Sequence, residues 1–173
     1  MNECSLQKMK GMQAYIAIRA GGNTAENRKP LLKDFLIASN YAGIAFGNAG
    51  CGAVHALSYA HGGAFHIPHG EANFICFTEV FKMYMRKQPK GKIELANKLF
   101  ADVLGCDPAD VYPALDEFLG KILEKKPLNE YGMTKDQVAE FAKSTVDNQQ
   151  RLLANNYVPL TEEEIAEIFE NLY

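Results

Sequence analysis

All four histidines of this 173-residue sequence lie between positions 55 and 69. They are His55, His61, His66 and His69, and the segment also holds a glycine pair and Pro68. Neutral imidazole is a common ligand of iron and zinc, and it changes charge near physiological pH. A cluster of this kind therefore points to a metal site built around a chain reversal.

The elements that must position these rings follow from the residues between them. We expect a short helix around Ala53–Tyr59, because Gly62 and Gly63 favour its end. Pro68 restrains the residue before it to an extended conformation, and a long helix is predicted from His69 to about residue 87. A helix, a tight turn and a second helix would return the chain against itself.

The predicted reversal brings His69 back against the face of the first helix that carries His55 and Tyr59, which are four residues apart. A metal ligand must be neutral imidazole, and the positive end of a helix dipole disfavours the protonated form of His69. Glu71 has the opposite sign and is favourable in the same first turn. His55 and His69 are thus candidates for two ligands of one metal ion.

Other interpretations of the cluster stay open. An isolated histidine on a helix is commonly an exposed polar residue or part of the core, and a site of this type needs three or four protein ligands. The sequence contains no HExxH or DxxxH motif. A metal-dependent hydrolase with its own site built from His55, His61, His66 and His69 is one alternative.

Composition limits the partners. A net charge of -3 gives no electrostatic reason to expect nucleic acid or an anionic membrane. The four cysteines are widely spaced and form no CxxC pair, which favours a reduced, cytoplasmic protein. The N-terminus has early charges and lacks the apolar stretch of a secretory signal.

Residues 35–54 carry no charge, and a stretch of that length could cross a bilayer. Asn40, Asn48 and several glycines argue against a membrane span, and no charged or aromatic anchors flank the stretch. We expect a deeply buried pair of helices here.

The rest of the sequence predicts one all-α, multi-helical domain over residues 1–173, since no alternating β pattern of useful length occurs. Thr161 and Glu164 form a capping box for the last helix. Its predicted buried stripe is Ile165, Ile168, Phe169 and Leu172. Further helices are predicted at 5–19, 31–46, 91–104, 110–125 and 134–153.

Three stretches carry a resemblance to a known family. They are "GNAGCGAVHALSY", "GGAFHIPHGEAN" and the C-terminal "YVPLTEEEIAEIFENLY". They resemble the iron-dependent (type III) alcohol dehydrogenases, and within that family most closely the 4-hydroxybutyrate dehydrogenases. The resemblance extends from around residue 8 to the end of the sequence.

The resemblance implies a helical domain like the C-terminal metal-binding domain of that family. There a divalent metal, usually Fe2+ and sometimes Zn2+, is held by one Asp and three His, and the last two correspond to His55 and His69. Tyr59 corresponds to a position near the nicotinamide and the substrate where the family often has histidine. Phe65 and Phe74 are candidates for the cavity wall, although ordinary core packing explains both.

The family also has an N-terminal domain that binds NAD(P), and a D-x-x-x-H helix that supplies the other two ligands. This sequence contains neither, so we expect weak metal binding and no alcohol oxidation by this chain alone. It would associate with itself or with a complementary chain that carries the cofactor domain. A non-catalytic helical assembly module is the alternative. His61, where the family usually has leucine, is either drift or a replacement ligand.

Overall fold

The computed structural model describes residues 20–173, and the helix predicted at 5–19 lies outside them. The described residues divide into two compact units, residues 20–49 with 113–124 and residues 50–112 with 125–173. Every regular element of the described residues is a helix, which confirms the all-α fold class. A single domain over residues 1–173 stays a prediction.

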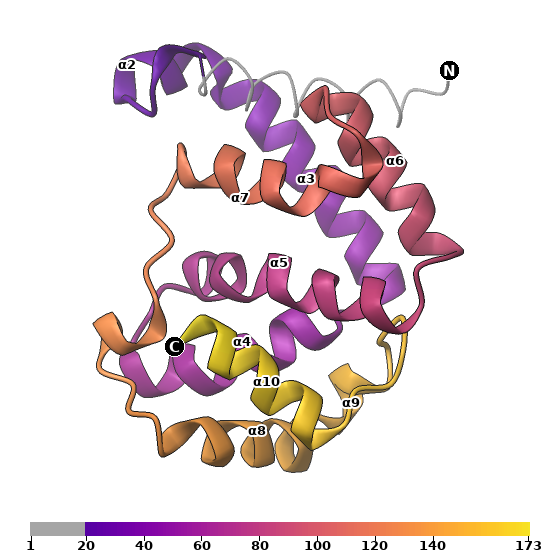
Figure 1. The fold of residues 1–173 in the computed structure, drawn as a ribbon. Helices are drawn as coiled ribbons and strands as arrows, with labels where there is room; N and C mark the ends of the chain where they lie inside the picture. The colour runs from indigo at the N-terminus through magenta and orange to yellow at the C-terminus, as the bar shows by residue number, and fades with distance from the viewer. Residues whose placement is uncertain (1–19) are drawn as a thin grey trace. The chain divides into compact units, whose positions relative to one another are not determined.

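The second unit holds the histidine segment and most of the buried core. Helices α4, α5, α8 and α10 pack against one another in it (Figure 1). Among the most deeply buried side chains are Leu57, Ile75, Ile165 and Phe169. The elements of this unit are α4 (Ala53–Phe65), α5 (His69–Lys87), α6 (Lys92–Leu104), η2 (Pro108–Asp110), η3 (Leu128–Tyr131), α8 (Gln137–Asn148), α9 (Gln150–Leu153) and α10 (Glu162–Leu172).

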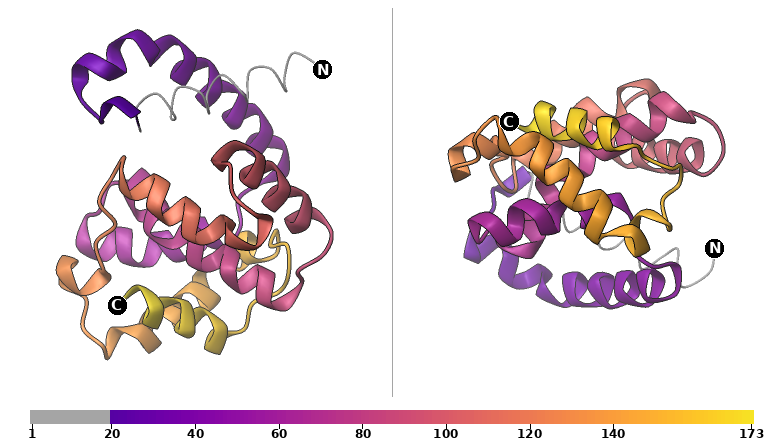
Figure 2. Two further views of the ribbon diagram at one scale, coloured as in Figure 1. Left: turned by 45° about the horizontal axis from the view of Figure 1, so that its top comes forward. Right: turned by 90° about the horizontal axis from the view of Figure 1, so that it is seen from below.

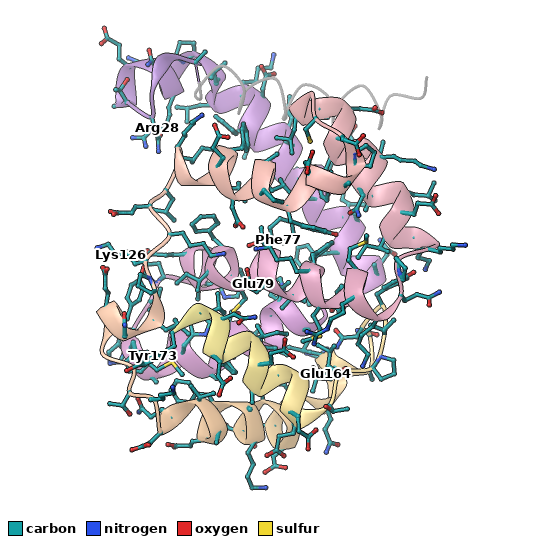
Figure 3. The ribbon with its side chains drawn as sticks, in the orientation of Figure 1. Arg28, Phe77, Glu79, Lys126, Glu164 and Tyr173 are labelled. Atoms are coloured by element: carbon teal, nitrogen blue, oxygen red, sulfur yellow. The ribbon has the colours of Figure 1, made fainter. Side chains whose placement is uncertain are left out.

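Helix α10 forms as its sequence predicts. The Thr161 hydroxyl accepts a hydrogen bond from the Glu164 amide, and the Glu164 carboxylate accepts one from the Thr161 amide. The predicted stripe from Ile165 to Leu172 is buried, and α10 lies beside α8 in both views of Figure 2. Glu164 also bonds Lys87 at 2.6 Å, which ties the start of α10 to the end of α5 (Figure 3).

Helix α4 is longer than predicted. It continues through Gly62 and Gly63 to Phe65, so the expectation that the glycine pair ends it is wrong. Gly62 lies where α4 crosses α5, and a methyl group added there would come within 3.3 Å of the Ala72 Cβ. Gly62 therefore permits close packing of α4 against α5, which outweighs its poor helix propensity, whereas no neighbouring atom lies within 4 Å of a methyl group added at Gly63.

The end of α4 is formed by His66 instead. It has the left-handed conformation, with φ 54°, and the amides of His66 and Ile67 both donate to the Gly62 carbonyl. The Ile67 bond is the 6→1 bond of the Schellman motif, which ends many helices, and Ile67 is buried as that motif favours. Pro68 then precedes the first residue of α5, as predicted. The chain thus reverses within three residues.

The first unit contains α2 (Ala25–Arg28), η1 (Lys29–Leu31) and α3 (Leu32–Ala49). Helix α7 (Val111–Gly120) begins in the second unit and contributes residues 113–120 to the first. The prediction of a deeply buried helix pair in residues 35–54 is wrong for α3, which has no buried residue. Leu36 is 72% exposed and Phe46 57%. The lack of charge in this stretch did not lead to burial. Apart from residues 20–49, the only described segment in this unit is 113–124, which is too short to cover α3.

Within residues 20–173, no helix combines the length and the apolar character that a bilayer crossing requires.

The two glycines of α4 provide a matched pair for a stability measurement. Gly63→Ala should raise the free energy of unfolding by about 0.5–1 kcal/mol, because alanine favours the helix and no atom outside the helix backbone lies near the added methyl group. Gly62→Ala should give no gain, since its methyl group would crowd Ala72. Urea denaturation of both variants tests this, and an equal gain in both would contradict the packing account.

Candidate functional site

The structure brings His55 and His69 together. Their ring centroids lie 5.3 Å apart, with a tilt of 54° between the planes. His55 stands on the first turns of α4 and His69 is the first residue of α5, so the short reversal between the helices sets this approach. The predicted juxtaposition of these two rings is therefore present, and their role as ligands stays a prediction.

Tyr59 completes the cluster from one turn further along α4. Its ring stacks on that of His69, with centroids 5.9 Å apart and a tilt of 26°. The side chain is 46% exposed, so its hydroxyl-bearing ring lies at the surface. His55, Tyr59 and His69 form one continuous surface group.

The spacing of the two imidazoles fits half of a divalent-metal site. Two rings that each bind a tetrahedral ion through one nitrogen at about 2.1 Å have centroids about 5 Å apart. Partial burial lowers the pKa of His55, and the neighbouring His69 lowers it further. Both causes favour the neutral form that a metal requires.

The rest of a ligand set is not found nearby. Among the residues that the structure describes, no group of three or more histidine, cysteine, aspartate or glutamate side chains is placed to hold a metal ion. Glu71, two residues after His69, accepts a hydrogen bond from the Tyr131 hydroxyl. The described chain thus offers two imidazoles and no third ligand of these types.

Asn156 holds the first turn of α4, which carries His55. Its Oδ1 accepts hydrogen bonds from the Ala53 amide at 2.6 Å and from the Tyr84 hydroxyl at 2.9 Å. Burial raises the pKa of Tyr84 to about 12, so this hydroxyl stays protonated and donates. A Cβ at Gly52 would lie 2.8 Å from the same Oδ1, so glycine is needed for the close approach.

The sequence did not indicate this contact, because Asn156 lies 103 residues after Ala53 and an asparagine in a connecting segment carries no helical signal. Its neighbour Asn155 makes a weaker contact with the same segment, at 3.4 Å from the Cys51 carbonyl oxygen.

His61 is part of the hydrophobic core. It lies inside α4 and is fully buried, with Nε2 donating to the Ala72 carbonyl at 3.2 Å and the ring edge against Phe169. Burial lowers the pKa of His61, and the hydrogen bond to the Ala72 carbonyl opposes that effect. The ring is a neutral part of the core, which leaves it no role as a replacement ligand.

The structure also locates His66, Phe65 and Phe74, and Phe74 is partly exposed on α5. His66 is exposed at the end of α4. Since His61 is buried and His66 caps the helix, the structure gives no support to a hydrolase site built from all four histidines. Phe65 packs against Phe141, with ring centroids 5.8 Å apart, and belongs to the core surroundings.

Comparison with known proteins identifies the family to which this helical fold and histidine pair belong. Residues 2–173 match the model of the Fe-containing alcohol dehydrogenase family, C-terminal, and the chain belongs to this family. The resemblance stated from the sequence is confirmed.

Individual relatives of this chain support the same family assignment. The chain is 51% identical to the 4-hydroxybutyrate dehydrogenase of Clostridium kluyveri over 162 residues, covering 94% of this chain and 43% of that protein. An alcohol dehydrogenase from an archaeon of a Red Sea brine pool has the same fold, with a TM-score of 0.81 at 16% identity over 98% of this chain and 44% of that one. The chain therefore spans less than half the length of these relatives.

The Asn156 contact predicts a contrast between two substitutions. Asn156→Ala should lower the free energy of unfolding by about 1–2 kcal/mol, because the Ala53 amide and the Tyr84 hydroxyl lose their acceptor. Asn156→Asp should lose less than Asn156→Ala, since the carboxylate keeps the acceptor for both donors and its charge is favourable at the N-terminus of α4. Chemical denaturation measures both, and equal losses would refute the capping role.

Buried His61 predicts a pH dependence of stability. Because its pKa is lowered in the folded chain, the unfolded chain binds a proton that the folded chain does not as pH falls below about 6.5. Stability should thus fall with pH from there down to the folded pKa. His61→Leu should reduce this slope by up to about 1.4 kcal/mol per pH unit. The exposed His66→Asn is the control, and an unchanged slope in His61→Leu would contradict the assignment.

Proposed function

We propose that this chain is the helical metal-binding part of an NAD(P)-dependent alcohol dehydrogenase that acts on a small hydroxy acid or alcohol, such as 4-hydroxybutyrate. The observation that carries the proposal is the convergence of His55 and His69 from adjacent helices in a chain of this family. The substrate class rests on the 51% identity to the clostridial 4-hydroxybutyrate dehydrogenase.

His55 and His69 would hold a divalent metal, Fe2+ or Zn2+. When bound, such an ion is a Lewis acid that lowers the pKa of an alcohol oxygen and so favours hydride transfer to NAD(P)+. The two imidazoles would contribute ring nitrogens as ligands from two packed helices. Tyr59 stacks on His69 and would line the edge of the cavity, where it limits the rotation of that ring.

The other ligands and the nicotinamide site would come from a complementary segment that carries a cofactor domain. The clostridial relative is more than twice as long as its match to this chain, so it has room for such a domain. Leu32, Leu36 and Ile44 on α3 leave an apolar surface exposed for it to cover. By itself the chain would bind metal weakly and would not oxidise alcohols.

A non-catalytic helical assembly module is the second candidate, and the exposed α3 face favours it as well. In that case the chain would form a stable homo-oligomer and gain no activity from a cofactor domain. The cytoplasmic location inferred from cysteine spacing remains a prediction.

Metal binding tests the two ligands directly. Calorimetric titration of the chain with Zn2+ should show weak binding, and His55→Ala and His69→Ala should each weaken it at least about tenfold, because one imidazole cannot hold the ion alone. His66→Asn removes an exposed histidine away from the pair and should leave the affinity unchanged. Equal affinity in all four proteins would refute the ligand assignment.

Activity is tested by complementation. The chain would be mixed with the part of the Clostridium kluyveri enzyme that it does not match, and NAD+ reduction would be followed with 4-hydroxybutyrate and Fe2+. Activity that requires both His55 and His69 supports the dehydrogenase proposal. A stable homo-oligomer without activity, measured by light scattering in the same mixture, contradicts the dehydrogenase proposal and supports the assembly module.

A further inference from the structure

The side chain of Asn73 contacts His69, and the proposed function gives it no role. Asn73 lies one helical turn after His69 on α5, so both side chains occupy the same face. Its amide nitrogen, Nδ2, is 3.0 Å from Nε2 and 3.5 Å from Nδ1 of the His69 ring. Because His69 is the first residue of its helix, its ring has no preceding helical turn to pack against. The contact with Asn73 can therefore restrain the orientation of the ring.

The orientation of the Asn73 amide follows from a second contact. Nδ2 donates a hydrogen bond to the His69 carbonyl oxygen at 3.0 Å. The amide oxygen could not replace it there, because two acceptors would face each other. The NH2 group is thus fixed toward His69, and Oδ1 lies buried without a hydrogen-bond partner.

The same geometry leaves the ring nitrogens available. Since Nδ2 lies at similar distances from Nδ1 and Nε2, it lies off the in-plane lone-pair axis of both. The amide therefore packs against the ring and does not occupy the lone pair that a metal would use. Tyr59 stacks on the same ring from α4, so His69 is restrained by one group from each helix.

We propose that Asn73 is a positioning residue for His69. Its amide, tied to the His69 carbonyl, holds the imidazole in the rotamer that faces His55. The consequence for metal binding rests on the proposed function, whereas the ring placement does not.

The test uses the whole chain with two variants and two readouts. Asn73→Ala removes both contacts. Asn73→Ser keeps a donor able to reach the His69 carbonyl but is too short to reach the ring, which separates helix stabilisation from ring placement. Circular dichroism confirms that each variant is folded, and the ring-proton cross-relaxation peak between His55 and His69 in NMR spectra reports the placement.

The proposal predicts that both variants weaken the His55–His69 peak, and that Zn2+ affinity falls about tenfold in each. An undiminished peak in folded Asn73→Ala would overturn it, as would a peak lost in Asn73→Ala and fully kept in Asn73→Ser. If His55→Ala and His69→Ala leave Zn2+ binding unchanged, the proposed function fails, and the NMR peak still decides the role of Asn73.

Discussion

The close packing of α4 against α5 is the constraint on which the site depends. Ala53, Ala56 and Ala72 are almost fully buried, and Gly62 lies where α4 meets Ala72 of α5. Small side chains let two helix backbones approach, and the left-handed turn at His66 joins the helices within three residues. His55 lies on α4 and His69 is the first residue of α5, so the 5.3 Å separation of their ring centroids depends on how these two helices pack.

The surrounding polar contacts hold this arrangement from outside the pair. Asn156 caps α4 just before His55, and Tyr84 of α5 donates to the same oxygen, so one amide joins both helices. Buried His61 bonds the Ala72 carbonyl across the same interface. Two of the four histidines thus meet at the surface, a third stabilises the packing beneath them, and His66 ends the helix. The four histidines are adjacent in the sequence but have different roles, because two lie on α4, one ends α4 and one begins α5.

Much of the fold was predictable because its signals are local. The Thr161 capping box and the apolar stripe after it lie within a dozen residues, and Pro68 marks the start of α5. The approach of His55 and His69 was also predicted, from the chain reversal between their helices and from the helix face that His55 shares with Tyr59. The family match extends beyond this segment, over residues 2–173.

Other features depend on contacts that no local pattern encodes. Gly62 continues a helix because Ala72 of the next helix packs on it, and propensity alone predicts the opposite. The burial of His61 follows from which face of α4 meets Phe169, more than a hundred positions away. The exposure of Leu36 on α3 could not be anticipated, because an uncharged stretch is equally consistent with a core and with a covered interface.

The central claim is that two imidazoles from adjacent helices can bind one ion. Anomalous diffraction from crystals of the chain soaked in Zn2+ tests it most directly. We predict one zinc peak within about 2.1 Å of a ring nitrogen of both His55 and His69. Zinc bound to only one of these rings, with the other turned away, would contradict the account.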